Sequence, residues 1–240
     1  MMTTPRLIAI GDVHGCIHAL DALLAAIQPS PQDQLIFLGD LIDQGRDTRD
    51  VLQRLITLER ECQVVLIQGN HEEMLYAARA SEQALRYWEN CGGVNTLNSY
   101  HFGGVLEHIP AEHWALLDRC RPYYETDEFI FTHAHYLPEL RMSEQPAHQL
   151  RWAMFDPAET LPHVSGKPVT VGHTEQKDSE VLDLGYATCI DTACWRHGWL
   201  TALDVRTKET WQASRWGLMR DTDEPSHRGA VPLWKAPAHA

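Results

Sequence analysis

Short hydrophobic runs along the chain end, one after another, in polar residues that can bind a metal ion. The run 7–10 leads into Gly11-Asp12-Val13-His14-Gly15, 35–38 into Gly39-Asp40, 64–68 into Gly69-Asn70-His71, 129–132 into His133, and 169–172 into His173. Runs of this length that are rich in β-branched residues predict buried strands. In open α/β sheets, ligands bind beyond the carboxyl ends of the strands. The pattern therefore predicts that these five polar ends lie together in one cleft.

Between the first three runs, hydrophobic residues recur at helical spacing. This spacing predicts helices over 17–27, 47–60 and 72–88, so the first half of the chain alternates strand and helix three times. Such alternation is typical of a parallel sheet whose strands are joined by right-handed crossovers.

The second half of the chain has a different pattern. Four glycines indicate an irregular stretch over 91–104, either a lid or an ordinary surface loop, and a short helix is expected over 111–120. Strands are predicted over 122–126, 128–133, 168–172, 179–184 and 186–190, with a hairpin over 198–213. A parallel half followed by a strand-rich half predicts an α/β (α+β mixed) fold, in which two sheets pack face to face with helices outside.

The five polar ends span most of the 240 residues and must converge. We therefore predict one domain over residues 1–219, which is long enough to bury a large core. Residues 220–240 contain three prolines and are predicted to form a tail that is partly disordered.

Charge and composition narrow the possible partners. The net charge of -13 argues against binding to the nucleic-acid backbone, which requires a basic surface. A phosphorylated substrate remains possible, because bound cations can invert the local field. No hydrophobic stretch is long enough to cross a membrane, the start of the chain has no signal-peptide pattern, and six cysteines lack CxxC spacing. We therefore expect a cytoplasmic protein with reduced thiols and no membrane partner.

Asp12, His14 and Asp40 are candidates for binding one metal ion. Asp12 and His14 are two positions apart in a turn between glycines, so both can reach the same ion. Asp40 can bridge to a second ion through its two carboxylate oxygens. Taken singly, an aspartate after a strand is more often an ordinary turn residue, so the prediction depends on the joint pattern.

Asn70, His133 and His173 are the candidates that complete the second ion's ligands. Taken alone, His133 would be read as a buried core histidine and Asn70 as a turn residue. Mixed oxygen and nitrogen ligands suit manganese, iron or zinc better than magnesium or calcium. Two such ions about 3.5–4 Å apart can bind a phosphoryl group and activate a water molecule.

The motifs GDxHG, GDxxD, GNHE and GHT follow one another, each after a predicted strand. In this order they resemble the calcineurin-like metallophosphoesterases and, within them, the PPP-type serine/threonine phosphatases, especially the small bacterial and phage enzymes. The likeness extends to Glu72-Glu73-Met74, Thr132-His133-Ala134-His135-Tyr136 and Asp191-Thr192-Ala193-Cys194, and it covers roughly residues 6–205. The resemblance implies a four-layer α/β/β/α sandwich of two mixed sheets flanked by helices.

The resemblance also implies a role for each polar residue. It assigns Asp12, His14 and Asp40 to one metal ion, and Asp40, Asn70, His133 and His173 to the other. A metal-bridging hydroxide is then expected to attack phosphorus in line. His71 is implied to be the general acid and Asp43 its hydrogen-bond partner, although Asp43 alone also fits a helix N-cap.

Gln44, Arg46 and Arg151 are candidates for binding the substrate phosphate. The family normally has Asp-Arg-Gly in the second motif, whereas this chain has Asp-Gln-Gly at 43–45. Glutamine can form hydrogen bonds but carries no charge. Arg46 is a candidate substitute. Arg151 precedes Trp152, close to the position at which the family has a second phosphate-binding arginine. Its alternative role is a surface salt bridge.

The expected function is a two-metal phosphoester hydrolase that resembles a serine/threonine protein phosphatase. Its substrate would be a phosphorylated protein or a small phosphate-bearing molecule, and manganese is the expected metal, with iron and zinc as alternatives. One alternative function is a phosphoanhydride hydrolase such as symmetrical bis(5′-nucleosyl)-tetraphosphatase, although Asp43 favours the phosphatase branch. The other is a catalytically weak interaction scaffold, which the complete ligand set argues against.

Overall fold

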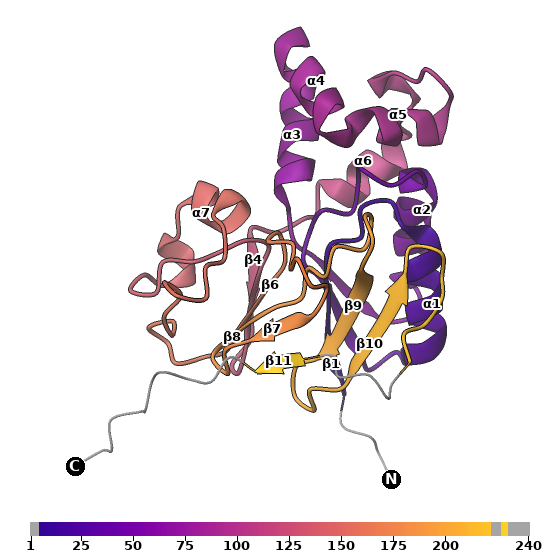
Figure 1. Ribbon diagram of the computed structural model, residues 1–240. Coiled ribbons are helices and arrows are strands. Elements are labelled where there is room, and N and C mark those ends of the chain that lie inside the picture. Colours follow the sequence, from indigo (N-terminus) through magenta and orange to yellow (C-terminus); the bar gives the residue numbers. More distant parts are fainter. Residues whose placement is uncertain (1–4, 222–226, 230–240) are drawn as a thin grey trace, which may run out of the picture.

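Two β-sheets pack face to face in the computed structural model, which describes residues 5–221 and 227–229 (Figure 1). The first sheet has the strand order β10-β9-β1-β2-β3, and the second has the order β11-β7-β8-β6-β5-β4. The strands of the first sheet are β1 (Leu7–Ile10), β2 (Gln34–Phe37), β3 (Gln63–Leu66), β9 (Trp199–Asp204) and β10 (Thr210–Ser214). Those of the second are β4 (Tyr123–Glu125), β5 (Ile130–Thr132), β6 (Val169–Val171), β7 (Val181–Asp183), β8 (Ala187–Cys189) and β11 (His227–Gly229).

Both sheets are mixed. In the first, β1, β2 and β3 are parallel neighbours, while β9 runs antiparallel to β1 and to β10. In the second, β5, β6 and β8 are parallel neighbours, and β4 and β7 pair antiparallel with β5 and β8. The predicted α/β fold with two mixed sheets is confirmed.

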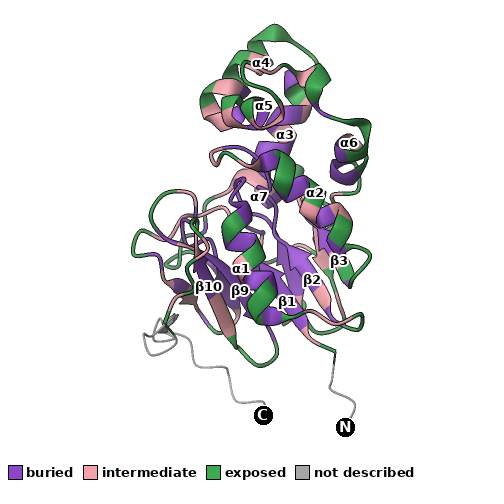
Figure 2. Ribbon diagram, turned by 90° about the vertical axis from the view of Figure 1, so that its right-hand side faces the viewer, coloured by how far each residue is buried: buried purple, intermediate pink, exposed green. Residues whose placement is uncertain are grey.

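Helices cover the outer faces of the sheets and extend beyond one end of them (Figure 1). Their bounds are α1 (Ile17–Ile27), α2 (Thr48–Leu58), α3 (Asn70–Ala78), α4 (Glu82–Trp88), α5 (Val94–Tyr100), α6 (Ala111–Leu117) and α7 (Ala147–Trp152). Helices α1 and α2 pack on the first sheet, and α7 packs on the outer face of the second. Figure 2 shows buried strands behind helices whose outer sides are exposed.

The alternation of side chains along β1 explains the layers. Leu7 and Ala9 point to one face, where they share a hydrophobic cluster with Phe131 of the second sheet. Ile8 and Ile10 point to the other face and pack with residues of α1 and α2. Because successive side chains of a strand point to opposite faces, a strand of four hydrophobic residues must be covered on both sides. This is why the sheet lies between a second sheet and a helical layer.

Two expected elements differ from the structure. The single helix predicted over 72–88 is wrong, because the chain breaks between α3 and α4, where the Ser81 hydroxyl accepts a hydrogen bond from Ala84 N (3.2 Å) and caps α4. The irregular stretch predicted over 91–104 is wrong for residues 91–100, whereas 101–104 is irregular. A π-helical turn over Glu89–Gly93 continues directly into α5. A positive φ of 109° at Gly92 allows this kink within a helical segment.

The predicted tail, 220–240, lies mostly outside the described residues. Within it, β11 pairs in parallel with β7, so this part of the tail belongs to the second sheet. The predicted single domain over 1–219 stays a prediction. None of the helices within the described residues is long and hydrophobic enough to span a membrane.

Candidate metal centre and active site

The five predicted strand ends converge at one edge of the sandwich. Asp40 follows β2, and its carboxylate lies 3.6 Å from His14 Nε2, after β1, and 3.5 Å from His133 Nε2, after β5. The backbone N–H of His173, after β6, donates to both oxygens of Asp12 (3.1 Å each). Three parallel strands of the first sheet and two of the second therefore bring these side chains together, as the strand pattern predicted.

Asp40 is shared by two clusters of possible ligands. His14, Asp40 and His71 form one group, and Asp40, His133 and His173 form the other. Within each group the candidate ligand atoms lie within 4.8 Å of one another. A carboxylate has two oxygens, so Asp40 can serve two ions at once.

Close backbone approach makes room for the carboxylates. A Cβ atom on Gly69 would overlap Asp40 Oδ1, and a Cβ atom on Gly172 would overlap Asp12 Oδ1. Glycine at both positions therefore lets the chains that carry the ligands pass close to the two aspartates.

Each of three histidines donates one ring N–H to a backbone carbonyl and directs its other nitrogen inward. His133 Nδ1 donates to Leu38 O (2.8 Å), His14 Nδ1 to Ile42 O (3.0 Å), and His173 Nε2 to Trp152 O (3.2 Å). Such hydrogen bonds fix the tautomer and leave the other nitrogen as a lone pair, as in metal-ligating histidines. Burial lowers the pKa of His14 and of His133 to about 4, which keeps both rings neutral.

Lone pairs face one another around Asn70. Its Oδ1 lies 2.9 Å from His133 Nε2 and 3.1 Å from His173 Nδ1. His133 Nδ1 and His173 Nε2 carry the ring protons, because each donates to a backbone carbonyl. The three atoms that face one another, Asn70 Oδ1, His133 Nε2 and His173 Nδ1, are therefore all hydrogen-bond acceptors with no proton between them. A cation removes this repulsion, so the donor set fits a divalent metal ion.

Buried carboxylates around the same site also fit a cation. Burial and neighbouring carboxylates raise the pKa of Asp12, and burial raises the pKa of Asp191 to about 7. No lysine or arginine in the described part of the chain forms an ion pair with Asp12, Asp40 or Asp191. Buried negative charge of this density is unfavourable unless a positive ion compensates it.

Backbone strain is concentrated in the same loops. Non-glycine residues with positive φ include His14 (44°), Asp40 (48°), Asp43 (69°), Gln44 (60°) and His173 (63°). A side chain in the left-handed region costs roughly 1–2 kcal/mol, although aspartate and histidine tolerate it better than most residues. Strain of this kind clusters at functional sites, where packing holds the backbone in place.

His71 is paired with Asp43 beside this centre. The His71 Nδ1–Asp43 Oδ2 distance is 2.8 Å, while His71 Nε2 lies 3.9 Å from Asp40 Oδ2. Burial lowers the pKa of His71, but the carboxylates of Asp40 and Asp43 outweigh this effect and raise it to about 9. The two carboxylates thus favour the protonated form of the ring.

Thr96 and Trp88 hold Asp43 in place. Thr96 Oγ1 donates to Asp43 Oδ1 (2.7 Å) and accepts from Asp43 N (2.9 Å), and Trp88 Nε1 donates to Asp43 Oδ2 (2.7 Å). Asp43 is fully buried, so these bonds compensate for its lost hydration. Sequence reasoning missed Thr96, because a threonine 53 positions away on α5 carries no motif.

Replacement of Thr96 by Val is expected to destabilise the fold by about 1–3 kcal/mol, because it leaves a buried carboxylate oxygen and a buried N–H of Asp43 unpaired. We also expect kcat to fall by about 10–100-fold through misplacement of His71. Denaturant unfolding and steady-state kinetics measure the two effects. Thr96→Ser should restore most of both. Thr57→Val, at an exposed threonine of α2, should change stability by less than about 0.5 kcal/mol. Equal effects of Thr96→Val and Thr57→Val would contradict the role of Thr96.

Glu72 is a second residue that sequence reasoning left without a role. Its buried carboxylate accepts from the backbone N–H groups of Gly69 (2.8 Å), Asp40 (3.0 Å) and Leu41 (2.8 Å). It therefore connects the loop after β2 to the first turn of α3, which carries Asn70 and His71. Its place in the first turn of a helix, where acidic residues are favourable, was the signal in the sequence that could have pointed to this role.

The three candidate phosphate-binding residues have partners outside the ligand set or face solvent. Gln44 Nε2 donates to Cys91 O (2.9 Å), and Arg46 is exposed. Arg151 forms two hydrogen bonds with Glu73 (3.0 and 3.1 Å) and one with Gln68 (3.1 Å). Within the described residues, no hydrogen bond joins any of these three side chains to a predicted metal ligand. Their role in phosphate binding stays a prediction.

Comparison with known proteins agrees with this geometry. The sequence profile of the calcineurin-like phosphoesterase family matches residues 5–181. Serine/threonine-protein phosphatase 1 of Salmonella typhimurium is 30% identical over 208 residues, which are 82% of this chain and 90% of the relative. Symmetrical bis(5′-nucleosyl)-tetraphosphatase of Erwinia tasmaniensis is 44% identical, but over 72 residues, or 30% of this chain and 26% of the relative.

The fold is similar to that of solved structures. A putative diadenosine tetraphosphatase superposes with a TM-score of 0.66 at 19% identity, covering 88% of this chain and 94% of the other. The resemblance predicted from the motifs is thus confirmed at the level of sequence and fold. The chain belongs to the calcineurin-like phosphoesterases, a family of binuclear metal-dependent enzymes, and is a metal-dependent phosphatase.

Proposed function

We propose that this chain hydrolyses phosphomonoesters with two divalent cations, in the manner of a serine/threonine phosphatase. In this proposal Asp12, His14 and Asp40 hold one ion, and Asp40, Asn70, His133 and His173 hold the other. The observation that carries it is the convergence of inward-facing lone pairs from Asn70, His133 and His173 on the shared carboxylate of Asp40.

Manganese is our proposal for the metal, with iron and zinc as alternatives, because the ligands mix carboxylate, amide and imidazole groups. When bound, two such ions polarise the phosphoryl group and lower the pKa of a water molecule. The protein contributes the fixed orientation of the ligands, since three histidine rings are hydrogen-bonded to backbone carbonyls.

We assign proton transfer to His71. Its Nε2 faces the ligand set, and its Nδ1 is held by the buried carboxylate of Asp43. The negative charge of Asp43 favours the imidazolium form, which can donate a proton from Nε2 to the departing alkoxide oxygen. Asp43 acts through His71 and is therefore a positioning residue.

Removal of metal tests the proposal. After dialysis against a chelator, hydrolysis of p-nitrophenyl phosphate and of a phosphothreonine peptide should be lost, and manganese should restore it. Diadenosine tetraphosphate, assayed in parallel, tests the alternative that the substrate is a phosphoanhydride. Full activity of the metal-free protein would contradict the proposal.

The phosphoanhydride alternative has support from one observation. Gln44 has no guanidinium, and the guanidinium of Arg151 is paired with Glu73. A good leaving group requires less transition-state stabilisation of this kind. A higher kcat/KM for diadenosine tetraphosphate than for the phosphopeptide would favour it.

We also expect a cytoplasmic location.

A further inference from the structure

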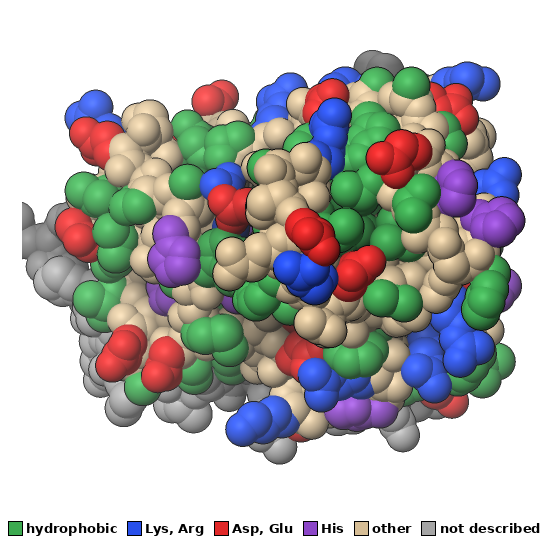
Figure 3. Space-filling view, turned by 90° about the horizontal axis from the view of Figure 1, so that it is seen from above, with side chains coloured by type: hydrophobic (Ala, Val, Ile, Leu, Met, Phe, Trp, Pro, Cys, Tyr) green, Lys and Arg blue, Asp and Glu red, His purple; other side chains and the backbone are tan. Residues whose placement is uncertain are grey.

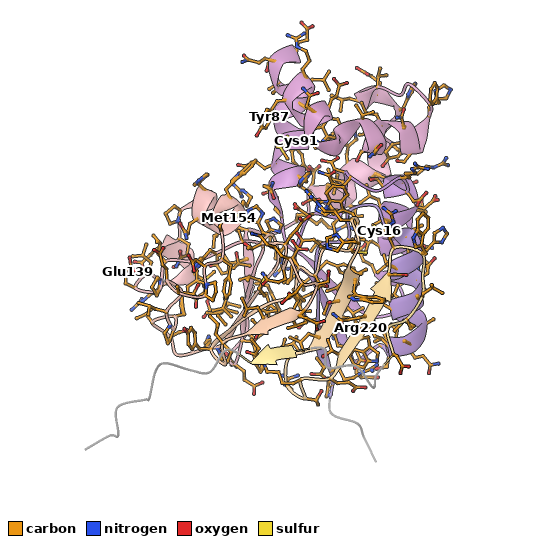
Figure 4. The ribbon with its side chains drawn as sticks, viewed as in Figure 1. Cys16, Tyr87, Cys91, Glu139, Met154 and Arg220 are labelled. Carbon is orange, nitrogen blue, oxygen red and sulfur yellow. The ribbon has the colours of Figure 1, made fainter. Side chains whose placement is uncertain are left out.

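A cavity of about 430 Å³ opens beside the predicted metal ligand His173. Its lining includes Met154, His173, Glu175, Lys177, Arg196 and His197. A second cavity of about 630 Å³ shares Met154, Glu175, Gln176 and Lys177 with it. Met154, labelled in Figure 4, lies beside the end of α7. The two cavities therefore adjoin each other and are together called the groove, whose smaller part borders His173.

Arg196 is held at the wall of this groove near the metal ligands. Its guanidinium lies 4.5 Å from the centre of the Trp195 ring, and its Nε lies 3.2 Å from Glu175 Oε1. Trp195 Nε1 donates to the same Glu175 oxygen (2.7 Å), and the Trp195 ring lies edge-on to His14, with 6.3 Å between ring centres. Stacking and one ion pair therefore restrict Arg196 before any ligand binds.

The two Nη groups of Arg196 donate to no described residue, whereas all three nitrogens of Arg151 already donate within the protein. Arg151 is similarly placed next to a tryptophan and a glutamate, but it uses Nε, Nη1 and Nη2 within the protein, and its side chain is 13% exposed. The side chain of Arg196 is 54% exposed, and its Nη atoms donate to no described residue. The guanidinium of Arg196 is therefore more accessible to an anion in the cavity than that of Arg151.

Basic side chains outnumber acidic ones in the part of the groove next to His173. Within residues 5–221, the side chains of Lys177 and His197 form no hydrogen bond or ion pair, and both are exposed. Glu175 is the only acidic residue among those described as lining this cavity, and it already binds Trp195 and Arg196. The second cavity adds Asp156 and Asp178, so an anion is favoured only in the first.

This local charge contrasts with the rest of the molecule. The chain carries a net charge of -13, and Figure 3 shows acidic and basic side chains interspersed over the face that bears the helices. Binding of a small anion here therefore depends on individual cations, because the molecule as a whole does not attract it.

We propose that Arg196 and Lys177 form a subsite for a second phosphate group of the substrate, next to the phosphate that is hydrolysed. The inference rests on the proposed function of the metal centre. A planar guanidinium can bind two oxygens of one phosphate, and an ammonium adds a point charge. The preferred substrates are then molecules with two neighbouring phosphates, and this subsite offsets the absence of arginine at position 44.

Binding of two small, hydrolysis-resistant probes tests the subsite. Methylenediphosphonate carries two phosphoryl groups and methylphosphonate carries one. Their Kd values are to be measured by calorimetry on the manganese-loaded protein and on Arg196→Ala, Lys177→Ala and Arg196→Lys. We expect Arg196→Ala to weaken methylenediphosphonate about tenfold more than methylphosphonate, the equivalent of one charge-assisted hydrogen bond. Lys177→Ala should act in the same direction, and Arg196→Lys should recover part of the loss.

Arg60→Ala is the matched control, because Arg60 is exposed after α2 and lines neither cavity. It should leave the ratio of the two Kd values unchanged. The subsite is overturned if the wild-type protein does not prefer the diphosphonate, or if Arg196→Ala weakens both probes equally, with or without a lower melting temperature. Absence of hydrolysis of every phosphoester by the loaded wild-type protein would instead overturn the proposed function, and the calorimetric ratio would still decide the subsite.

Discussion

His71→Asn is expected to lower kcat by about 10²–10⁴-fold while the protein keeps two bound metal ions. This is the range that a positioned general acid contributes. Asparagine cannot transfer a proton to the leaving oxygen, but none of the six proposed metal ligands is altered. The loss should be larger for phenyl phosphate than for p-nitrophenyl phosphate, because the poorer leaving group depends more on protonation.

Steady-state kinetics on both esters, with metal content from elemental analysis, measure this effect. His18→Asn, at an exposed histidine of α1, is the matched control and should leave kcat and metal content unchanged. An unaltered kcat in His71→Asn, or an equal loss for both esters, would contradict the assignment of His71 as the acid.

Asp40→Asn is expected to have the largest effect of any single change, at least a thousandfold on kcat, because Asp40 is the one residue common to both ligand clusters. Asparagine has nearly the same shape, and its carbonyl oxygen can still accept the hydrogen bond from His71 N. It lacks the charge and the second oxygen that a bridge between two cations requires. The metal content should fall from two ions to one or none.

Elemental analysis after manganese loading, together with kcat for p-nitrophenyl phosphate, tests this prediction. Circular dichroism of the metal-free variant shows whether the fold is kept. Asp21→Asn removes an exposed carboxylate 3.5 Å from Arg54 and serves as the control, with no expected change in metal content. Two tightly bound ions in Asp40→Asn would contradict the bridging role.

The local sequence pattern was sufficient to predict helices and strands whose boundaries depend only on neighbouring residues in the chain. The helix over 17–27 and the strand at 7–10 lie within one residue of their predicted bounds, because each has a periodic run of buried hydrophobic residues and a clear end. The break between α3 and α4 was not predicted, because a single serine outweighs a helical pattern that continues on both sides of it. The helix α5 was missed because four glycines between 91 and 104 favour a loop when judged locally.

The candidate site shows the same division. The residues that follow the strands were identified from the order of the motifs, and the structure brings them together. By contrast, the hydrogen bonds of Gln44 and Arg151 are formed with residues far away in the sequence. Gln44 donates to Cys91, 47 positions away, and Arg151 donates to Glu73, 78 positions away. Neither partner belongs to a motif, so no pattern in the sequence could show that these side chains are already engaged.

The family, the mixed α/β fold and the set of side chains at the strand ends could all be predicted from the residue pattern, because hydrophobic periodicity and glycine-rich turns act over a few residues. Which of the arginines beside a tryptophan keeps donors for a ligand depends on the folded chain. Arg151 and Arg196 each adjoin a tryptophan in the sequence, but the ion pair with Glu73 engages Arg151, while Arg196 stacks on Trp195 and keeps its two Nη groups open to the cavity beside His173. Hydrogen-bond partners from distant segments determine whether an arginine can bind an anion, and these partners come together only when the chain folds.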